Sequence, residues 1–118
     1  QTRMAPLEAE IDARRQEMND MGKRALLNSA SMRLMMNLSG ELMRSLVRDS
    51  GDLRAAMNEM RGTLETKIDV LKERPTRAAL EDLETWAIEK AGDERKEKVL
   101  AALSNFNDQL KKDGIVVR

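Results

Sequence analysis

The sequence predicts an all-α protein, an elongated helical hairpin or bundle with coiled-coil-like packing that forms an oligomer. Aromatic residues make up 2% of the 118 residues, whereas β-sheets are usually filled by aromatic and β-branched side chains. Alanine, leucine, methionine, glutamate, lysine and arginine dominate the composition, and these residues have high helix propensity. The apolar residues recur at spacings of three and four, in narrow stripes that favour a coiled-coil seam over a thick globular core.

Residues 1–74 are predicted to form one long helix or two helices in line. Pro6 suits the first turn of a helix, because its missing N–H group would have no partner there. The helix can break at residues 49–52, where Ser50 is of a type that caps a following helix. Glycines inside the helices at positions 22, 40 and 62 would allow close helix–helix approach.

An apolar seam runs along the first part of this segment over about six heptads. Its apolar members are Leu7, Ile11, Met18, Met21, Ala25, Met32, Met35, Leu42 and Leu46. Three seam positions hold the polar residues Arg14, Asn28 and Ser39. A polar residue such as Asn28 in an apolar heptad position is a device that fixes the register and the number of strands.

A second stripe with the same spacing follows the break. Its members are Leu53, Met57, Met60, Leu64, Ile68 and Leu71. The two stripes together are too long for 118 residues to cover alone. We therefore expect both stripes to form an interface with other copies of the chain, with another helical protein, or with both.

Residues 31–47 are apolar on more than one side. Leu34, Met36, Leu38 and Met43 add a second apolar side to the stretch that holds Met32 and Met35. A two-stranded seam does not require this second side. We therefore expect more than one neighbouring helix to contact this segment.

Residues 75–114 are predicted to form a hairpin of two shorter helices. Pro75 disfavours helical backbone at the residue before it, and Thr76 is a good N-cap for the next helix. Gly92–Asp93 marks the joint between the two helices, with a glycine that ends one and an aspartate that caps the other. Residues 115–118 are expected to form an extended tail, beyond which we expect the chain to continue.

The charge balance argues against several classes of partner. Lys plus Arg and Asp plus Glu both number 21, whereas proteins that bind nucleic acids or membrane surfaces carry a basic excess. We therefore expect no nucleic-acid partner and no direct membrane binding. Without cysteine or a signal-like segment in these residues, the compartment stays unknown, with the cytoplasm slightly favoured.

The side chains needed for most catalysis are missing. The chain has no histidine and no cysteine, so its serines have no imidazole to activate them and no thiolate metal site can form. The carboxylates alternate with basic residues, which is typical of a solvated helix face. We therefore expect no enzyme activity, no catalytic residues, no metal and no cofactor.

Methionine is unusually abundant, with nine residues. Three pairs have the spacing M-x-x-M, and thioether pairs on one helix face can bind Cu(I). These pairs are Met18 with Met21, Met32 with Met35, and Met57 with Met60. All six lie in register with the leucines, so we interpret them as apolar packing residues. Because methionine repacks around diverse partners, they also suit an adaptable binding surface.

The leading interpretation is a non-enzymatic structural or interaction protein, a self-associating helical scaffold or adaptor within a larger assembly. A first alternative is a ligand-sensing four-helix-bundle domain of a receptor, in which Arg33 or Arg44 faces inward and binds an anion. A second alternative is a membrane-surface or lipid-coat protein with its methionine-rich face on the interface. Oligomeric state, anion binding and liposome binding distinguish the three.

Overall fold

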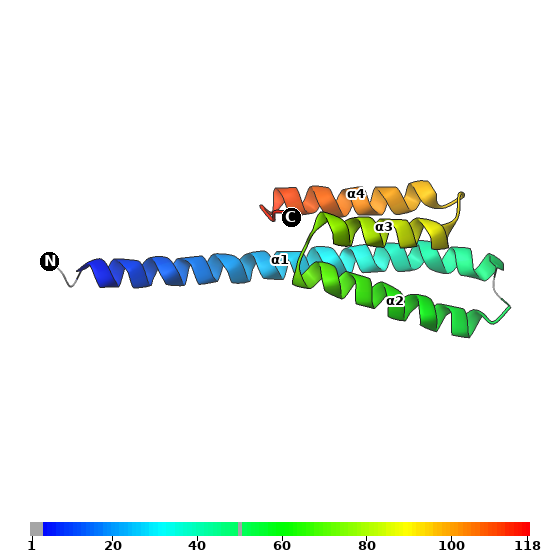
Figure 1. Cartoon of the computed structure of the whole chain (residues 1–118), viewed down its shortest axis with the longest axis horizontal. Coiled ribbons are helices and arrows are strands. Elements are labelled where there is room, and N and C mark those ends of the chain that lie inside the picture. Colours follow the sequence, from blue (N-terminus) through cyan, green and yellow to red (C-terminus); the bar gives the residue numbers. More distant parts are fainter. Residues whose placement is uncertain (1–3, 50) are drawn as a thin grey trace.

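The computed structural model describes residues 4–49 and 51–118, and the surroundings of side chains over 7–47 and 51–118. Four helices are present in these residues, without any strand (Figure 1). They are α1 (Met4–Asp49), α2 (Leu53–Glu73), α3 (Arg77–Ala91) and α4 (Lys96–Lys112). The all-α prediction is confirmed.

The helices run alternately in opposite directions, and α1 is the spine of the molecule (Figure 1). The C-terminal half of α1 contacts α2, α3 and α4, whereas its N-terminal half extends beyond the other helices (Figure 1). The molecule therefore measures 74 × 25 × 19 Å. The expectation that several helices contact residues 31–47 is confirmed, because Leu34 and Leu38 are buried in the core shared with α2, α3 and α4.

The chain reverses after α1, so α1 and α2 are not in line as the sequence pattern allowed. Helix α2 turns back along α1, with Asp52 as its N-cap, whose carboxylate accepts a hydrogen bond of 3.2 Å from the N–H of Ala55. Ser50, the expected cap, lies outside the described residues. The reversal lets the apolar stripe of α2 pack on the same chain instead of continuing a rod.

One hydrophobic core joins all four helices. The most deeply buried side chains are Leu34, Leu38 and Leu42 of α1, Leu64, Ile68 and Leu71 of α2, Leu83 and Ala87 of α3, and Val99 and Leu110 of α4. Each is at most 2% exposed, which shows that a single chain closes this core without a partner.

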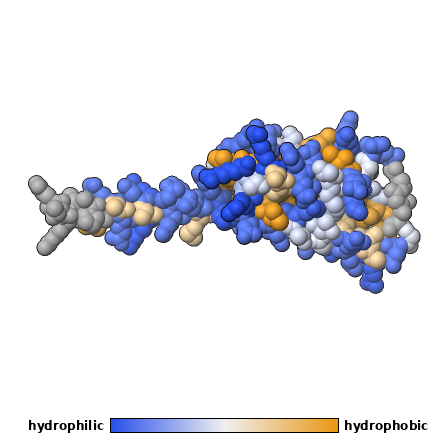
Figure 2. Space-filling model, in the orientation of Figure 1, coloured by the Kyte–Doolittle hydropathy of each residue, from blue (hydrophilic) through white to orange (hydrophobic). Residues whose placement is uncertain are grey.

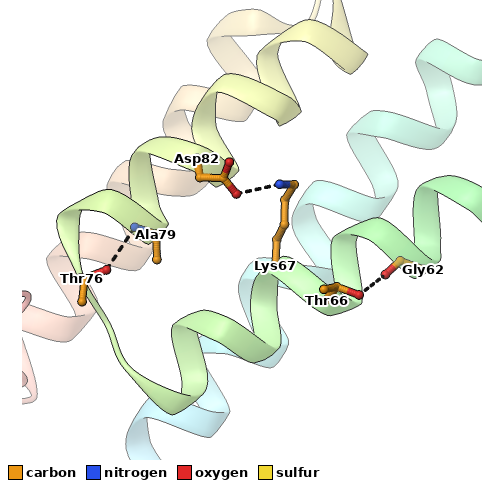
Figure 3. A network of polar contacts seen from close by, with 6 residues as sticks. All are labelled: Gly62, Thr66, Lys67, Thr76, Ala79 and Asp82. Carbon is orange, nitrogen blue, oxygen red and sulfur yellow. Dashed lines mark hydrogen bonds and ion pairs between the residues drawn. The ribbon is translucent and has the colours of Figure 1, made fainter.

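The two joints of the C-terminal hairpin have different geometries. Thr76 caps α3 as the sequence predicts, since its Oγ1 accepts a hydrogen bond of 3.1 Å from the N–H of Ala79 (Figure 3). Gly92 ends α3 at a φ of +74°, a backbone conformation that glycine adopts without a Cβ clash. Helix α4 begins two residues later than expected, with Arg95 rather than Asp93 at the N-cap position.

Polar contacts at the surface of the bundle link neighbouring helices. Lys67 of α2 donates to Asp82 of α3 at 2.6 Å (Figure 3), and its Nζ lies 6.0 Å from the centre of the Trp86 ring. Trp86 of α3, the lone tryptophan of the chain, therefore has a neighbour on α2. Arg95 likewise donates to Glu41 of α1 at 3.0 Å.

The chain ends beside the turn between α2 and α3. Residues 115–118 are not helical, and the N–H of Arg118 donates to the carbonyl of Pro75 at 3.1 Å. Ile115 and Val117 are half-buried against the core.

Candidate interaction surface

Helix α1 has two parts with opposite environments. Over residues 7–26, here called the arm, every residue is exposed. From Leu27 onward, one side of α1 is buried in the bundle, with Leu27, Ala30, Ser31, Leu34, Leu38 and Leu42 as its buried residues. The arm therefore has no tertiary packing on its own chain.

A second apolar side of α1 faces away from the bundle. We call it the outer face of α1, formed by Leu7, Ile11, Met18, Met21, Met32, Met36 and Val47. These residues are 47–72% exposed. At about 100° per residue, the middle of the outer face lies roughly 170° around the helix from the direction of Leu34 and Leu38.

The outer face continues without a change of direction from the arm onto the bundle. In the space-filling view, apolar residues alternate with hydrophilic ones along the arm, and larger apolar areas occur on the bundle (Figure 2). From Leu7 to Val47 the helix spans about 60 Å at about 1.5 Å per residue. A surface of this length and shape suits another helix.

A shallow open hollow lies within the outer face where α1 crosses the bundle. It has a volume of about 420 Å³ and is lined by Met32, Met35, Met36, Ser39, Gly40 and Met43. Ser39 Oγ lies 4.0 Å from Met43 Sδ. Four methionines without a charged neighbour in the lining make a soft apolar surface that can adjust to an inserted side chain.

The structure divides the predicted seam of α1 between the two sides of the helix. Leu7, Ile11, Met18, Met21, Asn28 and Met32 are exposed, Met35 and Leu46 are half-buried, and Leu42 is buried in the bundle. The core residues Leu27, Leu34 and Leu38 were not part of that seam. They recur at spacings of seven and four. The sequence of α1 therefore holds two overlapping apolar stripes, and the stripe that contains these three leucines forms the core.

The predicted interface on α2 requires a correction. Met60, Leu64, Ile68 and Leu71 are buried in the core of their own chain, while Met57 is half-buried and Leu53 is 37% exposed. The physical reason is the reversal after α1, which brings this stripe onto α1, α3 and α4. These four residues therefore have no free surface to offer another copy.

The glycines inside the helices do not mark close approach within the chain. A Cβ atom added at Gly22, Gly40 or Gly62 would meet no atom within 4 Å. Helix–helix packing therefore does not explain these three glycines, and alanine would fit at each of them.

Neither candidate anion-binding arginine faces the interior of the bundle. Arg33 and Arg44 are both exposed, and Arg44 lies 4.0 Å from Glu41 on the same helix. Arg33 does border a groove of about 330 Å³ between α1 and α4, which we call the α1–α4 groove. Its polar lining consists of Arg33, Asn37, Asn105, Asp108, Gln109 and Lys112.

The described residues contain neither a metal-binding cluster nor a membrane-spanning helix. Within the described ranges 4–49 and 51–118, no cluster of three or more histidine, cysteine or carboxylate residues could hold a metal ion. None of the helices described has a stretch long and apolar enough to cross a membrane.

Comparison with known proteins finds no similarity that would assign a function. The chain matches no protein-family model, no curated protein and no solved structure. The outer face of α1 is therefore judged on its own physical chemistry.

Proposed function

We propose that this protein is a non-enzymatic structural protein, a scaffold or adaptor that self-associates through the outer face of α1. One observation carries the proposal: seven large apolar residues, each about half exposed or more, share one side of a single helix. Burying one such side chain fully contributes about 1.5–3 kcal/mol. A partner that covers the outer face would gain several of these contributions at once.

The arm adds a second reason for a partner. Its 20 residues make no packing contact that buries a side chain, whereas most of the stability of helices in proteins comes from packing of an apolar face. A second helix along the outer face would supply the missing packing. A protein whose longest helix needs a partner to bury its apolar side chains would suit the role of a spacer or connector inside an assembly.

The mass of the protein in solution tests the proposal. Light scattering at micromolar concentration should give a multiple of the 13.4 kDa chain mass. Met18→Glu places a charge in the middle of the outer face and should shift the protein toward monomer. Ala9→Glu is the matched control, because residue 9 lies in the same arm on the opposite side of the helix. A monomeric wild-type protein, or equal effects of the two variants, would contradict the proposal.

A second candidate function is ligand sensing by the α1–α4 groove. Arg33 and Lys112 border the groove from two helices, together with three side-chain amides that can donate hydrogen bonds to an anion. The carboxylate of Asp108 in the same lining opposes anion binding. A thermal-shift series with phosphate and small carboxylates tests this function. An anion that stabilises the wild type but not the Arg33→Ala variant would support it. If no anion stabilises the wild type, this candidate function is ruled out.

A further inference from the structure

We infer that the occupant of the outer face is a second copy of the chain whose α1 runs antiparallel, so that each arm lies along the bundle of the other copy. This inference rests on the proposed self-association and adds its orientation and register. In the inferred register the midpoint falls next to Leu26, and residue numbers that face each other add up to about 53. Leu7 then faces Leu46, Met18 faces Met35, and Met21 faces Met32.

The shape of α1 supports this arrangement. The outer face runs along the arm, residues 7–26, and continues over the bundle, where Met32, Met36 and Val47 belong to it. In an antiparallel pair, each arm covers the methionine-lined hollow of the other copy. In a parallel pair, the two arms would meet only each other and would project from the bundles as a bare two-stranded coil of about three heptads.

The polar residues of the seam fit the antiparallel register. Arg14 then faces Ser39, and Asn28 faces Ala25, so these two polar residues meet a polar and a small residue. A parallel in-register pair would instead place Arg14 against Arg14 of the second copy inside the seam. Arg14 is exposed in the single chain, where its guanidinium donates to Glu10 at 3.0 Å, and the antiparallel pair leaves that contact intact.

The distribution of charge along α1 favours the same orientation. Residues 7–20 hold five acidic and two basic residues, a net charge of −3, whereas residues 33–46 hold two arginines and one glutamate, a net charge of +1. Antiparallel pairing brings these two segments together, and parallel pairing brings two segments of −3 together. A parallel pair would bring Glu10 near Arg15 of the second copy, but exposed ion pairs of this kind contribute little.

Ile11 has a specific neighbour in this arrangement. Its seam partner by register is Leu42, which is buried in the bundle of its own chain. Met43 follows Leu42 on the side of the outer face and lines the hollow. Ile11 of each copy therefore packs against Met43 of the other, and the flexible thioether accommodates the β-branched side chain.

Distances between spin labels in the assembled protein decide the orientation. The chain has no cysteine, so Ala9→Cys introduces one labelling site per copy, on the side of α1 opposite the outer face. In the antiparallel pair, residue 9 lies level with residue 44 of the other copy, and the two labels are about 53 Å apart along the helix at about 1.5 Å per residue. In a parallel pair they are about 20 Å apart, the width of two helices.

Lys23→Cys is the matched control, because residue 23 lies on the same side of α1 but close to the midpoint. Its two labels should be about 20–25 Å apart in either orientation, so this variant reports only that the pair exists. A distance near 50 Å for Ala9→Cys together with the short distance for Lys23→Cys supports the inference. Short distances for both overturn the orientation and leave self-association standing. Light scattering of a monomer, with no intermolecular distance for either label, overturns the proposed function as well.

Discussion

Ser31 is a polar residue inside the apolar core of the bundle. Its side chain is fully buried, and its Oγ has no hydrogen-bond partner among the described residues. A buried hydroxyl without a partner costs about 1–3 kcal/mol, and alanine also has the higher helix propensity. We predict that Ser31→Ala stabilises the protein by about 1 kcal/mol in urea unfolding. A loss of stability would show that the hydroxyl is bonded in solution, for example to a buried water molecule.

Leu38 and Met36 lie two positions apart on α1 and have opposite environments. Leu38 is fully buried, whereas Met36 is 72% exposed on the outer face. Leu38→Ala should destabilise the protein by about 2–5 kcal/mol, because it leaves a cavity in a core that one chain closes. Met36→Ala should change the stability of the single chain by less than about 0.5 kcal/mol. Urea unfolding at low protein concentration, where the chain is monomeric, compares the two variants. Similar losses in the free energy of unfolding would contradict the division of α1 into a core side and an outer face.

Arg24 connects the base of the arm with the end of α2. Its guanidinium donates to the carbonyl of Lys72 at 2.6 Å, and the carbonyl of Glu73 lies 3.4 Å away. The last carbonyls of a helix have no partner within the helix, and a cation near them contributes about 0.3–1 kcal/mol. Arg24→Ala should therefore lower the free energy of unfolding by about that amount, and Arg24→Lys should keep part of it. Thermal unfolding of the two variants measures the difference, and an unchanged midpoint for Arg24→Ala would show that the contact is not maintained in solution.

Asn28 lies at the junction of the arm and the bundle and is exposed in the single chain. An asparagine in an apolar seam lowers the stability of an assembly but selects one register and one number of strands. Asn28→Leu should therefore make the assembly more resistant to dilution while allowing more than one oligomeric state. Sedimentation velocity over a dilution series measures both effects. If mass and dissociation midpoint stay as in the wild type, Asn28 does not belong to the seam.

Both ends of α3 could be predicted from local chemistry, but the path of the chain between the helices could not. Thr76 and Gly92 act where the sequence places them, because capping depends on one or two residues. The segment 49–52 permits either a continuous rod or a reversal. Which one forms depends on whether the stripe of α2 finds an apolar surface on α1, and that is a long-range property.

The same limit applies to the candidate site. The spacing of three and four identifies Leu7, Ile11, Met18 and Met21 as apolar positions, and all four belong to the outer face. Over residues 27–47, however, α1 carries two apolar sides, and spacing alone does not tell which side meets the bundle. Only the packing of the other three helices separates Leu34 and Leu38 from Met32 and Met36.

The molecule as a whole is a compact bundle from which half of its longest helix projects (Figure 1). The bundle has its own core, so it is expected to fold without the arm. The outer face spans both parts, from Leu7 on the arm to Val47 on the bundle. Folding of the bundle and pairing of α1 are therefore separate processes, and variants of the core and of the outer face should affect different measurements.

The arm has a consequence for how assembly responds to concentration. In a single chain its backbone hydrogen bonds are supported by no buried side chain, and Gly22 near its base costs about 1 kcal/mol relative to alanine, so we expect the arm to be less helical alone than in a pair. Pairing would shift that equilibrium toward helix. The mean ellipticity at 222 nm should thus rise with protein concentration in step with the mass, and Gly22→Ala should move the rise to lower concentration. A constant ellipticity across the transition would show that the arm is fully helical before it meets a partner.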